Sequence, residues 1–346
     1  MEPTQLMGLL ITLPITLFIA LLAAGYLLTK ALIYYAHKKQ LLDIANHRSS
    51  HTHATPRIGG LSFVLLISLI IFGYVFFIAQ GLATSILYFI LLPIIIVALT
   101  GLADDIKGIS QSARFIVYFF CALVALGNFQ ALFAQPYWLI VIVGLLLSLS
   151  LSWLINLFNF MDGIDGIAAS ESIFILAALA FFSYQGGEIK LSYLLLLCIA
   201  PLLGFLILNW QPAKIFMGDI GSTFLGCLIA CLCLYAINAK LLSIYAAIIL
   251  LACFIVDASW TLAYRLLSGQ KWYQAHRSHH YQILARKIGS HQKVAALYTL
   301  VNLGWLFPLA LAANHYQEYA LLITTISLLP LILQCFIIGA GKAELN

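Results

Sequence analysis

Charged residues are scarce in this chain, and their scarcity indicates its class. Asp, Glu, Lys and Arg make up 8% of the 346 residues, while hydrophobic residues make up 63%. Soluble globular proteins carry roughly a quarter charged residues and about half apolar residues. The composition therefore excludes a soluble globular protein and predicts an integral membrane protein.

The chain also lacks paired cysteine motifs, a basic start and internal repeats. Its seven cysteines all fall inside apolar runs, which indicates small buried residues rather than a disulfide framework. The first five residues contain no Lys or Arg, and the first apolar run is long enough to span a bilayer, so we expect no cleaved signal peptide. No connecting segment is long enough for a soluble domain. We predict a single polytopic membrane domain over residues 1–346.

Long apolar runs are what the chain has in abundance. A helix needs about 20 apolar residues to cross the hydrocarbon core, and eleven runs reach or approach that length, the fourth being short. We therefore predict an all-α integral membrane protein with about 11 transmembrane helices. The runs cover residues 6–29, 59–79, 85–103, 113–128, 137–155, 167–184, 191–208, 219–237, 241–266, 293–313 and 319–340.

Basic residues gather on alternate connections between these runs. Fifteen of the seventeen Lys and Arg follow odd-numbered runs, and only Lys190 and Lys240 lie on the opposite side. The positive-inside rule then predicts a periplasmic N-terminus and a cytoplasmic C-terminus. Every acidic cluster and eight of the nine histidines share the basic side. We expect the working surface there, in inner loops near residues 30–58, 104–113, 156–167, 209–219 and 267–292.

One polar segment, residues 156–166, separates two apolar runs and reads Asn-Leu-Phe-Asn-Phe-Met-Asp-Gly-Ile-Asp-Gly. Its flanking glycines let a ligand approach the backbone closely. Its amides and carboxylates recur every three residues, a spacing that favours one helix face or a turn. A polar loop that merely leaves the membrane is the alternative. The four polar residues are Asn156, Asn159, Asp162 and Asp165.

Further acids end or begin other runs. Asp104 and Asp105 are adjacent, so they repel each other and need a cation or protons. Oxygen ligands of this kind suit Mg²⁺. Asp219 lies in a Gly-Asp-Ile-Gly-Ser turn before the eighth run, where a helix N-terminus favours phosphate and the acid favours a cation. Phe216 nearby offers a flat face for a base. The alternatives are a water-facing helix end and helix capping.

Two basic loops suit phosphate. The first combines Arg48 and Arg57 with hydroxyl and glycine residues. The second reads His-Arg-Ser-His-His from His276 and has no cysteine, which favours an anion cradle over a zinc site. Head-group anchoring and an ordinary surface loop are the alternatives. Asp257 lies inside the ninth run, where an acid is a functional candidate unless it is a paired structural acid.

Carboxylates for a metal and cations for phosphates, all expected at one membrane face, indicate phosphoryl chemistry. Such chemistry inside a bundle of membrane helices indicates that one substrate is itself in the membrane. We therefore expect a lipid phosphate to meet a cytosolic nucleotide substrate.

On these residues the chain resembles the polyprenyl-phosphate N-acetylhexosamine-1-phosphate transferases, the WecA, WbpL and MraY group of glycosyltransferase family 4. The matching motifs follow in order between residues 46 and 282. The resemblance implies transfer of a sugar 1-phosphate from a UDP-N-acetylhexosamine to undecaprenyl phosphate, with release of UMP. It also implies Mg²⁺, with Mn²⁺ as a substitute, and a location in the bacterial inner membrane with the active site facing the cytoplasm.

The resemblance also assigns roles. Asp219, with Asp105, would hold the metal, and Asp104 and Asp105 would lie by the lipid phosphate as catalytic residues, although a phosphate oxygen needs positioning more than deprotonation. Contacts to the nucleotide-sugar would come from Asn156, Asn159, Asp162, Asp165, Phe216 and Gly218. Contacts to phosphate or sugar would come from Arg57, Lys107, His276, Arg277, His279 and His280. Further candidates are Arg48, Lys214 and Asp257.

The last basic loop departs from the WecA pattern, because Arg277 and Ser278 separate His276 from the next two histidines. This spacing resembles the WbpL type, which starts O-antigen in lipopolysaccharide synthesis on 6-deoxy sugars such as FucNAc or QuiNAc; GlcNAc is the other expectation. The muropeptide-type His-rich loop of MraY is absent. We expect the bilayer and the two substrates as partners, no nucleic acid, and a homodimer as the form of self-association.

Two other classes compete with this interpretation. A secondary transporter with acidic coupling sites would place its acids near the membrane midplane on two related halves, but here the acids lie at run ends and no repeat is visible. A membrane prenyltransferase also uses aspartates and Mg²⁺, but its Asp-rich repeats have a wider spacing than Asp162 and Asp165.

Overall fold

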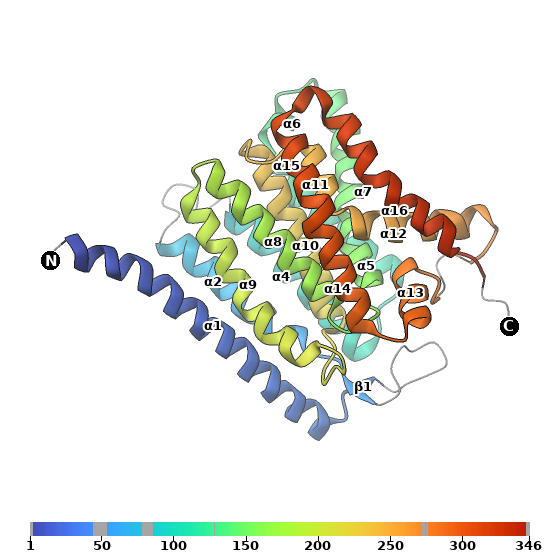
Figure 1. Cartoon of the computed structure of the whole chain (residues 1–346), viewed down its shortest axis with the longest axis horizontal. Helices are drawn as coiled ribbons and strands as arrows, with labels where there is room; N and C mark the ends of the chain where they lie inside the picture. Colours follow the sequence, from blue (N-terminus) through green and yellow to red (C-terminus); the bar gives the residue numbers. More distant parts are fainter. Residues whose placement is uncertain are drawn as a thin grey trace.

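The computed structural model describes residues 3–43, 54–77, 86–127, 129–271, 274 and 276–343, with the backbone alone for residues 3–14 and 131. Helices make up nearly all of the described chain (Figure 1), which confirms the predicted all-α class. One small ribbon is the exception in these residues: β1 (Leu42–Asp43) pairs antiparallel with β2 (Thr55–Pro56).

The helices follow one another in the order of the apolar runs. The first part of the chain contains α1 (Pro3–Lys39), α2 (Gly60–Phe77), the π-helical η1 (Leu87–Leu91), α4 (Leu92–Lys107), α5 (Gln111–Leu126), α6 (Gln130–Phe133) and α7 (Tyr137–Met161). The second part contains α8 (Ile167–Gln185), α9 (Ile189–Asn209), α10 (Gly218–Asn238), α11 (Ile244–Leu250), α12 (Ala252–Leu267), α13 (His280–Ile288), α14 (His291–Val301), the π-helical η2 (Asn302–Leu306), α15 (Phe307–His315), the 3-10 helix η3 (Gln317–Tyr319) and α16 (Ala320–Ile338).

Each predicted apolar run corresponds to a helical stretch in the predicted order. In the part of the chain that the structure describes, nine stretches are long and apolar enough to cross a membrane, and α11 with α12, bent by 76°, would make a tenth. The short fourth run forms α5, whose 16 residues span about 24 Å at 1.5 Å per residue, less than the roughly 30 Å of a hydrocarbon core. The protein is a multi-pass membrane protein. Which end faces the cytoplasm remains a prediction.

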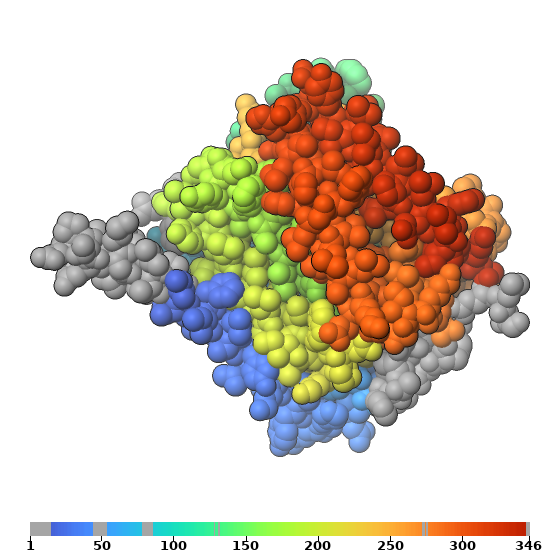
Figure 2. Space-filling view, in the orientation of Figure 1, coloured from blue at the N-terminus to red at the C-terminus, as the bar shows by residue number. Residues whose placement is uncertain are grey.

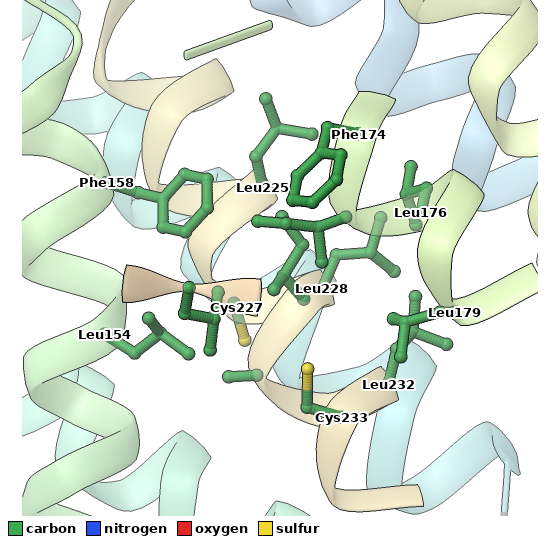
Figure 3. Close-up of a cluster of buried hydrophobic side chains, with 14 of the residues drawn as sticks. Leu154, Phe158, Phe174, Leu176, Leu179, Leu225, Cys227, Leu228, Leu232 and Cys233 are labelled. Carbon is green, nitrogen blue, oxygen red and sulfur yellow. The ribbon is translucent and has the colours of Figure 1, made fainter. Parts of the chain in front are cut away.

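Helix α10 lies at the centre of the bundle. Of an 18-residue apolar stretch within this helix, 89% is buried. Helices α2, α4, α7 and α8 pack around it. Leu225, Leu228 and Leu232 of α10 lie in the buried apolar cluster of Figure 3, as expected of a helix that is apolar on all sides. A Cβ at Gly226 would lie 2.9 Å from Ile155 Cα, so this glycine lets α7 approach α10 closely. The packing fixes the position of the α10 N-terminus, which carries Asp219.

The outer helices present apolar side chains. Helix α1, at the edge of the bundle in Figure 1, packs against α9, and a Cβ at Gly204 would lie 2.3 Å from the Leu22 carbonyl oxygen. In Figure 2, the coloured part of α1 and the C-terminal helices lie at the surface of the molecule. Leu27 and Phe336 on these helices are 61% and 66% exposed. An apolar outer surface suits contact with lipid, where water cannot solvate polar groups.

Candidate functional site

A cavity of about 740 Å³ opens among the loops of the protein. All five loop segments that the sequence analysis singled out contribute to its lining. Its volume is in the range of roughly 300–1,000 Å³ that accommodates nucleotide-sized ligands. The sequence-predicted residues in the lining are Arg57, Asp105, Asn159, Asp162, Asp165, Phe216, Gly218, Asp219 and Arg277.

Asp105 holds the N-terminus of α10 in place. Its Oδ1 accepts from the Asp219 backbone N–H and its Oδ2 from the Ile220 N–H, both at 3.0 Å. The Arg57 guanidinium donates to the Asp105 carbonyl oxygen. Gly218 has φ +70°, and a Cβ there would lie 2.1 Å from the Arg57 carbonyl oxygen, so only glycine fits. The observed contacts of Asp105 are those of a helix cap contributed by another helix.

The Asp219 carboxylate lies between an amide and a guanidinium. Asn159 Nδ2 donates to Asp219 Oδ1 at 2.8 Å and to Ser222 Oγ at 3.1 Å. Arg114 Nη1 donates to Asp219 Oδ2 at 2.8 Å. These contacts leave Asp219 in the cavity wall with its orientation set from both sides.

Arg114 was not among the predicted site residues. The same Nη1 that contacts Asp219 also lies 2.5 Å from Asp104 Oδ2, so a single nitrogen joins two carboxylates. Asp104 Oδ1 accepts from the Ile109 N–H at 2.5 Å. Neither Asp104 nor Arg114 belongs to the cavity lining, but Arg114 links Asp104 to Asp219, which does. The only sequence signal for Arg114 was its place at the start of an apolar run, which is equally typical of an anchor to lipid head groups.

Asp162 and Asp165 follow α7 but differ in their surroundings. Asp165 Oδ2 accepts from the Ala213 N–H at 3.1 Å, and its Oδ1 lies 3.2 Å from Nδ1 of His291, the first residue of α14. Asp162 has no side-chain hydrogen bond to any residue that the structure describes. Burial, together with the charges of Asp219, Asp105 and Asp165, raises the pKa of Asp162 well above its usual value. A free carboxylate in such a place favours a bound cation.

Phe216 and Arg57 are brought together by backbone pairing. The Phe216 N–H donates to the Pro56 carbonyl oxygen at 2.7 Å, and the Gly59 N–H donates to the Phe216 carbonyl oxygen at 2.9 Å. This pairing joins the first and fourth predicted loops. Phe216 and Arg57 both belong to the cavity lining.

Two further arginines line the cavity. Arg277 and Arg286 are both in the lining, and Arg286 Nη1 donates to the Arg277 carbonyl oxygen at 2.9 Å. Arg286 and His291 were missed by the sequence analysis because they lie in an ordinary amphipathic stretch. Of the other candidates, Lys107 and Lys214 are exposed and outside the lining, and Asn156 donates to the Ser152 carbonyl oxygen instead. Arg48 lies outside the described residues.

The three histidines and Asp257 form a buried network of their own. Asp257 Oδ1 accepts from the His280 N–H at 2.8 Å and Oδ2 from the Tyr281 N–H at 2.9 Å, which caps α13. His279 Nδ1 lies 3.3 Å from Asp257 Oδ1, and the His276 ring stacks on His279. Burial lowers the pKa of His276 to about 3. None of these side chains belongs to the cavity lining, so their binding of phosphate or sugar stays a prediction.

We expect Asp257→Ala to loosen α13 and with it the wall that carries Arg277 and Arg286. Each buried N–H left without an acceptor costs about 1–3 kcal/mol, so amide hydrogen exchange across residues 276–288 should increase and the melting temperature should fall. Asp257→Asn keeps one acceptor oxygen and should show a smaller change. The exposed Glu318→Ala serves as the control. Unchanged exchange in Asp257→Ala would contradict the capping role.

Comparison with known proteins gives a consistent result. The model of glycosyl transferase family 4 matches residues 86–237. A probable undecaprenyl-phosphate N-acetylglucosaminyl 1-phosphate transferase of Bacillus subtilis (strain 168) is 29% identical over 304 residues, which cover 85% of this chain and 82% of the relative. Phospho-N-acetylmuramoyl-pentapeptide-transferase of Streptococcus pneumoniae (strain 70585) is 29% identical over 222 residues, covering 58% of this chain and 66% of the relative.

Proposed function

Because the model of glycosyl transferase family 4 matches residues 86–237 of this chain and a similar relative is named as an undecaprenyl-phosphate sugar 1-phosphate transferase, we propose that the chain transfers an N-acetylhexosamine 1-phosphate from a UDP-sugar to undecaprenyl phosphate and releases UMP. The observation that carries the proposal is the cavity itself. Five aspartates, three arginines and one phenylalanine from separate loops surround one space in a membrane protein. Anionic, basic and aromatic groups together match a metal-bound nucleotide diphosphate meeting a lipid phosphate.

In the proposed reaction an oxygen of the lipid phosphate attacks the phosphorus that bears the sugar. The bond from that phosphorus to the oxygen bridging the two phosphates breaks, and UMP leaves with the bridging oxygen. Arg57, Arg277 and Arg286 would bind the phosphates and offset their charge, and Phe216 would stack on the uracil. Most of the catalysis would come from positioning and electrostatics, so no aspartate needs to act as a base.

The residues of the cavity fit a divalent cation that is shared with substrate. Among the described residues no group of three or more His, Cys, Asp or Glu could hold an ion alone. Mg²⁺ usually takes one or two carboxylates, with waters and substrate phosphates completing its shell. Asp219 and Asp162 would supply the carboxylates. When bound, the cation would neutralise charge on the diphosphate.

The finer assignments also remain proposals. The sugar would be GlcNAc or a 6-deoxy hexosamine such as FucNAc or QuiNAc, used in O-antigen synthesis at the bacterial inner membrane with the cavity facing the cytoplasm. The protein in vesicles containing undecaprenyl phosphate should be given UDP-GlcNAc, UDP-GalNAc, UDP-FucNAc and UDP-QuiNAc in turn, with UMP release as the readout. UMP release should require both the lipid and Mg²⁺. Failure of all four donors would overturn the proposed function.

We expect Asp162→Asn to weaken use of the UDP-sugar more than use of the lipid. The substitution removes a charge that faces the cavity without another partner among the described residues, while it keeps the side-chain shape. KM for the UDP-sugar should rise about tenfold, equivalent to loss of one charged interaction of about 1.4 kcal/mol, and KM for undecaprenyl phosphate should change less. Equal changes in both KM values would count against this role.

A further inference from the structure

One buried carboxyl group lies outside the cavity and has no part in the proposed reaction. Glu171, in the first half of α8, is 2% exposed, and Asn302, the first residue of η2, is 1% exposed. Asn302 Nδ2 donates to Glu171 Oε2 at 2.6 Å. No Lys, Arg or His among the described residues forms an ion pair with Glu171. The titratable side chain nearby on α12 is the uncharged thiol of Cys253.

A second observation concerns the two remaining oxygens of this pair. Glu171 Oε1 and Asn302 Oδ1 are both buried, and neither has a hydrogen-bond partner in the part of the chain that the structure describes. Both atoms are acceptors when the carboxyl group is ionised. Two buried acceptors left unpaired in the same amide–carboxyl pair are unfavourable, and an ionised carboxylate without a cation in an apolar interior is more so.

A single proton on Glu171 would neutralise the buried charge and give both unpaired oxygens a hydrogen-bond partner. We infer that Glu171 is a neutral carboxylic acid whose Oε1–H donates to Asn302 Oδ1, while Asn302 Nδ2 donates to Oε2, so that the two side chains form a cyclic acid–amide pair joining α8 to η2. In this arrangement each of the four polar atoms has one partner, and no charge is buried. The structure thus contains a proton-binding site within the membrane-spanning part of the protein.

The pair of Glu171 and Asn302 joins two segments that also meet at the cavity. The residue just before α8 that reaches the cavity is Asp165, and the first residue of α14 is His291, which contacts Asp165. Helices α8 and α14 pack against each other. Glu171 and Asn302 make a second, deeper tie between the same two segments. They therefore act as positioning residues that hold His291 on the cavity wall.

The π-helical turn explains why a tie is needed at this place. Helix α14 passes into η2 at Asn302, where the α-helical hydrogen-bond pattern is interrupted. An interruption of this kind weakens the register of the helix on either side. A directional side-chain pair at the first residue of the turn fixes that register, which purely apolar contacts would not do.

Infrared spectroscopy tests the protonation directly and does not depend on any enzymatic activity. The protein in lipid vesicles at neutral pH should show the carbonyl band of a protonated carboxylic acid, and this band should be absent from Glu171→Gln. In Asn302→Leu the band should remain and shift to the frequency of a less hydrogen-bonded acid. Identical spectra of the wild type and Glu171→Gln in this region would overturn the inference.

The positioning role rests on the proposed function and has its own measurement. Glu171→Gln can form a cyclic amide–amide pair with Asn302, so its KM and kcat should stay within about twofold of the wild type. Glu171→Leu cannot form the pair and should raise KM for the UDP-sugar roughly tenfold with a smaller change in kcat. Equal KM values for Glu171→Leu and the wild type would overturn the positioning role. If Glu171→Leu does not fold, Asn302→Leu replaces it in the same comparison with the same two outcomes.

The infrared and kinetic measurements test the protonation of Glu171 and the proposed function separately. If the wild-type protein released no UMP, the proposed function would be contradicted, and the infrared band would still report whether Glu171 carries a proton. Conversely, an active wild type without that band would contradict the inference about Glu171 alone. The variant Glu318→Gln, with an exposed acid, controls for the loss of one carboxyl group.

Discussion

Asp219→Asn should remove nearly all UMP release. The Asp219 carboxylate is oriented by Asn159 on one oxygen and by Arg114 on the other. An amide at this position carries no charge for a cation, and its NH₂ group would face one of these two donors. A bound cation contributes several kcal/mol of transition-state stabilisation. Losing about 4 kcal/mol of it corresponds to a fall in kcat of about a thousandfold.

The control and a second measurement make this prediction specific. Glu318→Gln removes an equal charge from an exposed site near the start of α16 and should leave kcat within about twofold, as expected of a surface change. Binding of Mn²⁺ to the purified protein, followed by its paramagnetic resonance signal in the presence of UDP-sugar, should weaken in Asp219→Asn. Retained turnover together with retained Mn²⁺ binding would assign the cation to other residues.

The fold was predictable because membrane helices follow from apolar length. All eleven apolar runs became helical stretches in order, since the hydrocarbon core leaves the backbone few other ways to satisfy its hydrogen bonds. The 76° bend between α11 and α12 was not predictable. Leu251 lies at the break, and neither a proline nor a glycine marks it in the run 241–266. Helix α11 packs on α15 and α16, and α12 packs on α7 and α16; the local sequence contains none of these contacts.

The site was predictable in its composition but less so in its roles. Asp105, Asp162 and Asp219 were all identified as acids at run ends, and the structure brings them to one cavity. Which acid caps a helix and which faces the cavity depends on contacts between distant segments. Asp105 bonds to backbone N–H groups more than a hundred residues away, whereas Asp162 faces the cavity. Asp257 shows the same ambiguity, because its capping partners on α13 lie 23 and 24 residues further along the chain.

Arg114 is the clearest case of a role that sequence alone could not assign, and its replacement should have the second largest effect. In Arg114→Met the side-chain stem is kept, but the nitrogen that joins Asp104 to Asp219 is lost. The two carboxylates would then lie close together without a cation, and they would separate or take up a proton. Hydrogen bonds to charged groups contribute about 1.5–3 kcal/mol. We therefore expect kcat to fall about a hundredfold.

Two further variants distinguish the bridging role from a general effect of charge. Arg114→Lys should recover most of the lost activity, because a single nitrogen of Arg114 makes both contacts and an ammonium group can do the same. Lys190→Met removes an equal charge from an exposed position at the start of α9 and should leave kcat within about twofold. If Arg114→Met were as active as Lys190→Met, the contact with Asp219 would be incidental. If Arg114→Lys were as inactive as Arg114→Met, the planar guanidinium itself, and not its charge, would be what the cavity requires.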